Sequence, residues 1–252
     1  MTYPILEFSS TREALIEPSR LIDSGDVPEH CVICFFWDVI EKVVKEHDAT
    51  VLAANQWEDG RHPVYEINHR GRRLAFLHPG VGSAHAVGML EETIALGCRK
   101  FIACGGCGVL DLDVAFGHLV VVSAAVRDEG ASYHYLPPSR EVQADAEGVR
   151  ALAETLDARD IPYCVGKTWT TDAPYRETPD KIVKRREEGC LVVEMEAAGM
   201  IAVTQFRDVT FGQVLYGGDD LTGEIWDSRD WDSRSDVRER LFWLCADAVL
   251  TL

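Results

Sequence analysis

The stretch that shows the fold most directly is one where an apolar run passes straight into a helical pattern: Val192-Val193-Glu194-Met195-Glu196-Ala197-Ala198. Similar short runs of apolar and β-branched residues alternate with helical patterns along most of the chain. This alternation is typical of a mainly parallel or mixed sheet with helices on its faces. The sequence therefore predicts an α/β fold.

Nine segments have the pattern of strands and six have the pattern of helices. The predicted strands are Val32 to Phe36, Val51 to Ala54, Val64 to Ile67, Arg73 to Leu77, Phe101 to Cys104, Leu119 to Ala125, Tyr163 to Lys167, Cys190 to Val193 and Phe211 to Tyr216. The predicted helices are Asp38 to His47, Ser83 to Leu96, Ala144 to Ala158, Pro179 to Glu188, Glu194 to Gln205 and Asp236 to Leu250. No long linker rich in Gly, Ser or Pro divides the chain, so we expect residues 1–252 to form a single domain.

The composition is that of an acidic globular protein. Hydrophobic residues make up 46% of the 252 residues and charged residues 27%, close to the globular average. The 25 Lys and Arg against 42 Asp and Glu give a formal charge of -17, which repels polyanions, so we expect neither nucleic acid nor anionic membrane as a partner. No apolar run is long enough to span a bilayer and the first residues lack a signal-peptide pattern, so we expect a cytoplasmic protein.

Two C-x-x-C pairs, Cys31 with Cys34 and Cys104 with Cys107, raise the alternative of a zinc or redox module. The first pair lies in a predicted strand, where the period of two points the two thiols to opposite faces of the sheet. We therefore expect reduced, mostly buried thiols and no metal site.

Two glycine-rich turns are candidate anion sites. Gly80 and Gly82 lie between a predicted strand and a predicted helix, and Gly105 and Gly106 follow the next strand. Glycine permits turns that aim backbone N–H groups at one point, and ligands of open α/β sheets bind at the carboxyl ends of strands. Either turn could equally be a plain connection.

Three carboxylates stand at strand ends. On the predicted helix from Glu194, the side chains of Glu194 and Glu196 would point in nearly opposite directions, so only one could face a pocket. The ordinary alternative is a solvated charge at a helix N-terminus. Asp219 follows a strand and the Gly217-Gly218 pair, and could be a general acid or part of a simple turn.

Four further segments have weaker patterns. The segments 127–135 and 168–176 interleave aromatic and polar residues, as the walls of a pocket for a flat heterocycle do. The basic cluster 181–188 predicts a solvated helix face. The near-duplication Trp226-Asp227-Ser228-Arg229-Asp230 and Trp231-Asp232-Ser233-Arg234-Ser235 predicts a loop, either a lid or a plain surface connection.

In this order the motifs resemble the superfamily of nucleoside phosphorylases and nucleosidases, which includes hexameric purine nucleoside phosphorylase, uridine phosphorylase and methylthioadenosine nucleosidase. The resemblance runs from about Gly71 to Ala202 and on through Asp219. Pro79 to Gly82 is similar to the family's Gly-Ile-Gly loop, Cys104 to Gly108 to its phosphate loop, Val193 to Ala197 to its ribose motif, and Val126 to Ser132 to a segment of the uridine phosphorylases.

The resemblance implies a three-layer α/β/α fold with a mixed, partly closed central sheet, and an enzyme that cleaves the N-glycosidic bond of a ribonucleoside. It implies that Glu196 accepts hydrogen bonds from the ribose hydroxyls, that Met195 packs against the sugar, and that Asp219 protonates the leaving base. It also implies a homo-oligomer, a dimer or a hexamer, with no cofactor except inorganic phosphate as co-substrate. The remaining implied site residues are Val193, Glu194, Tyr175 and Gly218 for substrate, and Gly80, Gly82, Gly105 and Gly106 for the anion.

The chain departs from the phosphorylase pattern where phosphate binds. Trp37-Asp38 stands where phosphorylases carry a Gly-Asp-Pro-x-Arg loop, and Ala103 and Gly106 replace an arginine and a hydroxyl residue. Arg61 approximates an arginine that some members lend to a neighbouring subunit, and Asp38 or Glu41 could orient water as in nucleosidases. Phosphorolysis to base and ribose 1-phosphate is our first expectation, with hydrolysis or binding without turnover as alternatives and with purine against pyrimidine left open.

Overall fold

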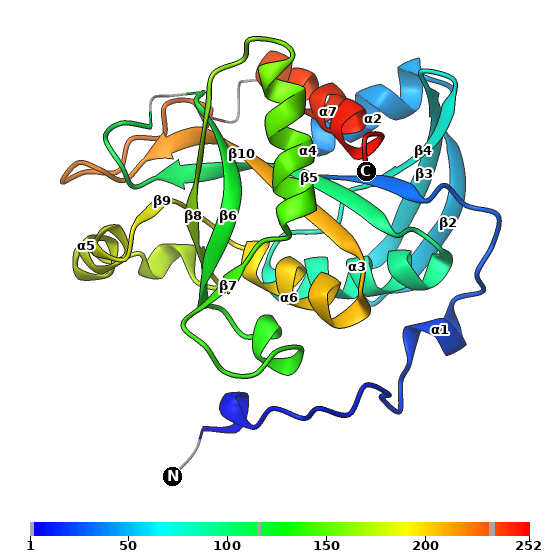
Figure 1. Cartoon of the computed structure of the whole chain (residues 1–252), viewed down its shortest axis with the longest axis horizontal. Coiled ribbons are helices and arrows are strands. Elements are labelled where there is room, and N and C mark those ends of the chain that lie inside the picture. Colours follow the sequence, from blue (N-terminus) through cyan, green and yellow to red (C-terminus); the bar gives the residue numbers. More distant parts are fainter. Residues whose placement is uncertain (1–2, 115–116, 232–234) are drawn as a thin grey trace.

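The computed structural model describes residues 3–114, 117–231 and 235–252. Within them the strands form one ten-stranded sheet (Figure 1). All nine predicted strands are confirmed, and the short β7 is additional. The strands are β1 (His30–Cys34), β2 (Thr50–Trp57), β3 (Gly60–His69), β4 (Arg72–Leu77), β5 (Lys100–Val109), β6 (Leu119–Asp128), β7 (Glu141–Gln143), β8 (Tyr163–Thr171), β9 (Cys190–Glu194) and β10 (Thr210–Asp220).

The six predicted helices are also confirmed, and a one-turn helix precedes them. The α-helices are α1 (Pro18–Leu21), α2 (Trp37–Glu46), α3 (Ser83–Leu96), α4 (Ala146–Asp157), α5 (Pro179–Glu187), α6 (Ala197–Arg207) and α7 (Ser235–Val249). Short 3-10 helices are η1 (Pro4–Leu6), η2 (Ala131–His134) and η3 (Pro174–Arg176).

Part of the sheet closes on itself. The strand order is β10-β6-β8-β9-β5-β1-β4-β3-β2, and β10 also pairs in parallel with β5. Strands β5, β9, β8, β6 and β10 therefore form a closed ring, and β1, β4, β3 and β2 extend from it as an open sheet. Because parallel and antiparallel pairs are both present, the expected mixed, partly closed sheet is confirmed.

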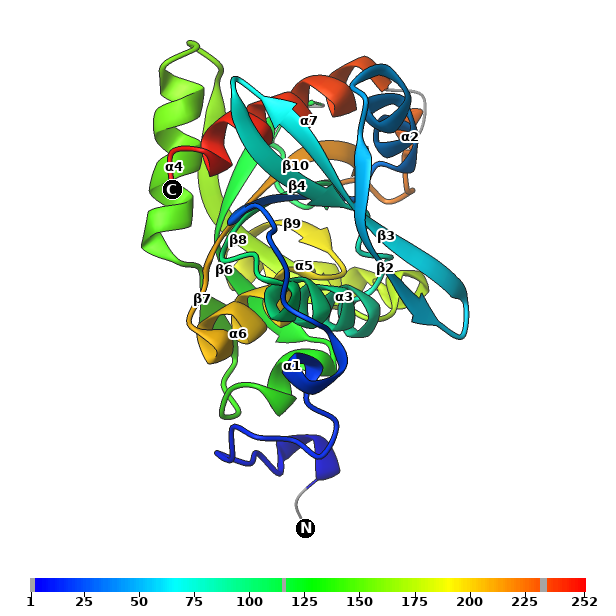
Figure 2. The ribbon, with the colours of Figure 1, turned by 90° about the vertical axis from the view of Figure 1, so that its right-hand side faces the viewer.

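Helices cover both faces of this sheet (Figures 1 and 2). One core contains Val39 of α2, Leu152 of α4 and Phe242 of α7, all fully or almost fully buried. The other core contains Met89 of α3 and Met200 of α6. The two apolar layers confirm the predicted three-layer arrangement.

Strand β5 is longer than its pattern predicts. The predicted strand ends at Cys104, but Gly105 and Gly106 continue it, opposite Leu215 and Tyr216 of β10. The prediction of a glycine turn here is therefore wrong. A methyl group on Gly106 would lie 3.4 Å from the Tyr216 ring, so the glycines allow close approach of an aromatic neighbour while interrupting the apolar pattern of a strand.

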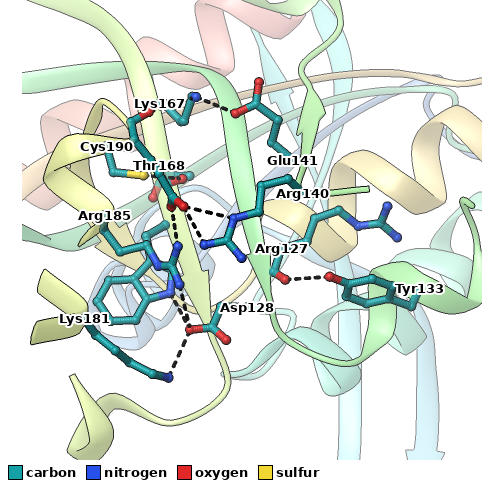
Figure 3. A network of polar contacts seen from close by, with 12 residues as sticks. Arg127, Asp128, Tyr133, Arg140, Glu141, Lys167, Thr168, Lys181, Arg185 and Cys190 are labelled. Atoms are coloured by element: carbon teal, nitrogen blue, oxygen red, sulfur yellow. Dashed lines mark hydrogen bonds and ion pairs between the residues drawn. The ribbon is translucent and has the colours of Figure 1, made fainter. Parts of the chain in front are cut away.

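The basic cluster 181–188 is only partly a solvated face, which corrects the prediction. Arg185 is buried, its guanidinium lies 5.4 Å from the centre of the Trp169 ring, and it forms ion pairs with Asp128 and Glu188. Asp128 also accepts hydrogen bonds from Trp169 Nε1 and Lys181 Nζ at 3.1 and 3.2 Å (Figure 3). This carboxylate at the end of β6 therefore attaches α5 to the sheet.

The predicted burial of the cysteines and the opposite orientation of Cys31 and Cys34 agree with the structure. Cys31 lies in the core beneath α3, whereas Cys34 lies in the core beneath α2 and α7, so the two thiols do lie on opposite faces. All eight cysteines are free, and burial raises the pKa of Cys31, Cys34, Cys104 and Cys107. Among the described residues, no helix combines the length and apolar character needed to cross a bilayer.

Candidate active site

Glu194 ends strand β9 and fixes the turn into α6. Its buried carboxylate accepts hydrogen bonds from the backbone N–H groups of Glu196 and Ala197 at 2.7 and 2.6 Å, and from Thr170 Oγ1 at 2.6 Å. Glu194 thus satisfies N–H groups at the start of the helix that have no partner within it. Its role in this structure is to hold the segment that carries Glu196.

Glu196 is the second buried carboxylate of the motif. It is the N-cap residue of α6, and its Oε1 accepts a hydrogen bond of 2.6 Å from the backbone N–H of Gly82. The turn before α3 and the turn before α6 therefore meet at this carboxylate. Met195, between the two glutamates, is half-buried, whereas Val193 is buried within β9.

The predicted helix start at Glu194 is wrong, because α6 begins only at Ala197. Glu194 belongs to a strand and Glu196 to a helix cap, so the helical argument that separated their side chains does not apply. The two carboxylates instead interact, and burial together with the charge of Glu194 raises the pKa of Glu196 to about 8. The hydrogen-bond donors around Glu194 oppose the effect of burial there, although the net pKa of Glu194 is still raised.

The turn that holds Glu196 depends on glycine. Gly82 has φ of 91° and ψ of 143°, a backbone conformation that residues with side chains rarely adopt. A methyl group there meets no atom within 4 Å, so a substitution would cost backbone strain and not a clash. In this structure the Gly82 N–H donates to Glu196, so the turn positions this carboxylate. The role of the turn as an anion site remains a prediction.

We expect Gly82→Ala to lower stability by about 1 to 3 kcal/mol through this strain, and to raise KM for any substrate that Glu196 binds by displacing the donor to this carboxylate. Thermal unfolding and steady-state kinetics measure the two effects. Gly25→Ala is the matched control, because Gly25 lacks a positive φ and a methyl group there comes no nearer than 3.9 Å to its neighbours. Equal effects of both substitutions would contradict the assigned role of the turn.

Asp219 lies beside the same strand ends. A methyl group on Gly108 would stand 2.9 Å from Val193 Cγ1 and 3.5 Å from Asp219 Oδ1, so β5, β9 and β10 bring these residues together. Asp219 Oδ2 accepts a hydrogen bond of 2.6 Å from Trp226 Nε1. Gly218 is buried, and a methyl group on it would lie 3.3 Å from Trp231 Cβ. The loop after β10 thus contacts the Asp219 carboxylate through Trp226.

The predicted loop 226–235 is confirmed for residues 226–231, residues 232–234 lie outside the described residues, and Ser235 already belongs to α7. Asp227 pairs through its backbone with Asp220, which folds the loop back onto the end of β10. Trp226 nevertheless stays 59% exposed. The reading of this loop as a lid remains a prediction.

Glu177 is an acid near this site that the sequence patterns did not single out. It follows η3, and burial together with the negative charge of Asp219 raises its pKa to about 7, against the opposing effect of Lys181. Its only sequence signal is a position two residues beyond Tyr175. The side chain of Tyr175 itself is 98% exposed, so the structure does not bring it to this group, and its stacking on a base remains a prediction.

The segment 127–135 is held by hydrogen bonds within its own loop and to the start of α3. Arg127 donates hydrogen bonds to the carbonyl oxygens of Leu136 and Pro137 and to the hydroxyls of Ser132 and Ser139. Ser83, the first residue of α3, donates to the buried Glu129 at 2.9 Å. This network holds its own loop and the start of α3, which accounts for the polar residues of the segment.

Aromatic rings occupy the region after β1. The centres of the Phe35 and Trp37 rings lie 6.4 and 5.5 Å from that of His78, and Gly80 donates its N–H to His78 Nδ1 at 3.1 Å. Burial lowers the pKa of His78, which favours its neutral form. Ala103 is completely buried. Arg61, His62 and His78 line a cavity of about 340 Å³ beside Gly80.

Residues 29–243 match the family model of the phosphorylase superfamily. The chain belongs to the phosphorylase superfamily. It is 26% identical over 198 residues to a guanosine phosphorylase from Halorubrum lacusprofundi, a match that covers 79% of this chain and 81% of that protein.

Solved structures share the fold of this superfamily member. A uridine phosphorylase from Vibrio fischeri aligns with a TM-score of 0.76 and 18% identity, over 92% of this chain and 95% of that one. An AMP nucleosidase from Bacteroides thetaiotaomicron aligns with a TM-score of 0.72 and 21% identity, over 90% and 89%. Proteins named as a phosphorylase and as a nucleosidase therefore share the fold of this chain.

Proposed function

We propose that this protein cleaves the N-glycosidic bond of a ribonucleoside by phosphorolysis, giving the free base and ribose 1-phosphate. The observation that carries the proposal is the buried carboxylate of Glu196, held by Gly82 at one edge of the site, with Asp219 beside the ends of β5 and β9. A carboxyl group that accepts hydrogen bonds from two adjacent hydroxyls suits ribose, because such donors favour the ionised form, to which hydrogen bonds are strong.

The acid needed by the leaving base is the second element of the proposal. Cleavage places positive charge on the sugar and negative charge on the base, so a proton donor must face the base. Asp219 would fill this role, and Glu177, with its pKa raised to about 7, would hold a proton next to it near neutral pH. Protonation of N7 is possible only for a purine base, which favours a purine substrate. The segment 126–132 resembles uridine phosphorylases, but the side-chain donors of its Arg127 are engaged within the same loop and are not free for a pyrimidine. We therefore propose a purine ribonucleoside.

The nucleophile would be phosphate bound near Gly80, where Arg61 supplies a cation in the adjoining cavity. The name of the guanosine phosphorylase relative supports this choice. Hydrolysis is the second candidate. The buried Ala103 and the exposed Trp37 stand where the phosphorylase pattern has a phosphate-binding arginine and an arginine-containing loop. Each missing charged contact would weaken phosphate binding by about 1.5 to 3 kcal/mol.

Incubating the purified protein with a panel of purine and pyrimidine ribonucleosides, with and without inorganic phosphate, tests both parts. We expect a purine ribonucleoside to release base only with phosphate, with ribose 1-phosphate as the second product. Phosphate-independent release of base and free ribose would replace phosphorolysis by hydrolysis. No cleavage of any nucleoside, although calorimetry shows binding, would overturn the assignment of an enzyme.

We also propose that the protein works as a homo-oligomer, either a dimer or a hexamer. The support is the family together with Arg61, which follows the exposed turn between β2 and β3 and resembles an arginine that members lend to a neighbour. Light scattering at several protein concentrations measures the oligomer. A monomer with full activity would contradict this proposal.

A further inference from the structure

Two histidines and one aspartate meet where the β2–β3 hairpin packs against the start of α3. Asp59 lies in the hairpin turn, His62 on β3 and His85 on α3. His62 Nε2 is 3.0 Å from Asp59 Oδ1, and His85 Nε2 is 3.8 Å from Asp59 Oδ2. One donor atom from each of the three residues lies within 4.8 Å of the others. We call these residues the Asp59–His62–His85 cluster.

The His85 ring is held in one orientation. A methyl group on Gly80 would lie 2.3 Å from His85 Nδ1, so this nitrogen faces the backbone of the Gly80 turn. The centre of the Trp57 ring lies 5.2 Å from the centre of the imidazole, and Trp57 itself packs against Gly88 of α3. These contacts aim Nε2 of His85 toward the Asp59 carboxylate.

That nitrogen has no hydrogen-bond partner among the described residues, although the atom is buried. An ordinary Asp–His ion pair accounts for His62 and Asp59, but it leaves His85 Nε2 unsatisfied. A buried polar atom without a partner is costly and is commonly satisfied by a water or an ion. An ion between the three side chains would supply the missing bond.

The space and the donor atoms decide which ion fits. The cluster borders the cavity of about 340 Å³ beside Gly80, and a more open hollow at Trp57 and Glu58 adjoins it, so water can complete the coordination. Imidazole nitrogens suit zinc and similar transition metals, whereas Ca²⁺ and Mg²⁺ prefer sites made of oxygen atoms. Two histidines and one carboxylate are an established ligand set for Zn²⁺.

We propose that Asp59, His62 and His85 bind one divalent transition-metal ion of the Zn²⁺ type. The bound ion joins the tip of the β2–β3 hairpin to α3. Bonds to zinc are about 2.0 to 2.2 Å long, so the three side chains must close by a small amount around the ion. Asp59 permits this because its side chain is 56% exposed in a turn.

The proposal is tested with Co²⁺ on the full chain after chelator treatment and dialysis, because Co²⁺ replaces Zn²⁺ at such sites and its spectrum reports its ligands. We expect one ion per chain, with visible absorption bands of a low-coordinate nitrogen and oxygen site. Loss of a group that only supports a metal ligand typically weakens binding about 10- to 100-fold. His62→Gln and His85→Gln each remove a ligand itself and are expected to exceed this range, at more than about 100-fold. Asp59→Asn keeps one ligand oxygen and should weaken binding by only about 10-fold. His134→Gln is the matched control, since His134 is exposed on η2.

Three results would overturn the proposal: no stoichiometric binding by the parent, equal binding by the His62 and His85 variants, or a thiolate-to-cobalt absorption band, which would assign the metal to cysteines. Asp59→Asn keeps the test decisive if a histidine variant fails to fold, because this exposed turn residue supports little structure. A thermal scan provides the second measurement. At one Zn²⁺ concentration, Zn²⁺ should raise the Tm of the parent and of His134→Gln by equal amounts, and that of Asp59→Asn by less.

Discussion

Replacing Glu196 by Gln is expected to lower kcat/KM for the preferred ribonucleoside at least about 100-fold. Free Glu196 has a pKa of about 8, but two hydroxyl donors in the complex favour its ionised form. Each of these two hydrogen bonds is worth about 1.5 to 3 kcal/mol, and the amide retains only part of that. A deoxyribonucleoside lacks one of these two hydroxyls, so its kcat/KM should fall less on this substitution. Steady-state kinetics with both nucleosides measure the difference.

The same substitution is expected to stabilise the free protein. In the folded state Glu196 keeps its proton up to about pH 8, whereas its ordinary pKa is 4.5. Between these values the folded state binds more protons than the unfolded state, so the Glu196 contribution to stability falls as pH rises. Glu196→Gln removes this penalty, and its Tm advantage over the parent should grow from pH 5 to pH 8.

Glu46→Gln, an exposed change on α2, is the control for both measurements and should alter neither. A Glu196→Gln enzyme that turns over ribonucleosides as fast as the parent would remove the basis of the proposed ribose site. If the Tm difference between Glu196→Gln and the parent stays constant with pH, the raised pKa of Glu196 is contradicted, but the proposed ribose site is not. The two readings therefore separate the function of the carboxylate from its electrostatics.

Asp219→Asn is expected to lower kcat for a purine ribonucleoside by about 10² to 10⁴, the usual range for loss of general acid catalysis. KM should change little, because the asparagine can still accept the hydrogen bond from Trp226 Nε1. A riboside with a nitrophenolate leaving group, which departs without a proton, should be cleaved almost as fast by the variant. The ratio of the two rates is the diagnostic quantity.

Asp220→Asn is the neighbouring control, because Asp220 binds the Thr222 N–H and the Arg229 guanidinium and not Trp226. The charge of Asp219 raises the pKa of Glu177, so Asp219→Asn should also lower that pKa, as a carboxylate NMR titration would detect. A pKa of Glu177 that does not change would show that the two acids do not interact. Equal loss of both leaving groups would contradict general acid catalysis by Asp219.

The elements of this fold follow from local sequence patterns because each is an apolar run bounded by turn residues. Strand β1 and helix α3 were predictable from such runs within a few residues. The continuation of β5 through Gly105 and Gly106 was not, because the glycines carry no side-chain pattern. Their strand conformation comes from pairing with Leu215 and Tyr216, more than a hundred residues along the chain.

The site divides in the same way. The motif 193–197 and Asp219 stand out in the sequence, because carboxylates directly after apolar strands are unusual. The raised pKa of Glu177, the burial of Arg185 against Trp169 and the approach of His85 to Asp59 have no local signal. Each arises between elements that are distant in the chain, and burial and charge act through space.

The sequence by itself determined the alternation of strands and helices and singled out the carboxylates of the proposed site, because period and residue type are local properties. The tertiary structure decided which of those residues meet: it closed the sheet through β10 and β5 and joined Gly82 to Glu196. It also made Glu194 a structural anchor and left Glu196 as the carboxylate with the strongly raised pKa of about 8. These outcomes depend on contacts between distant segments, whose geometry no local pattern contains.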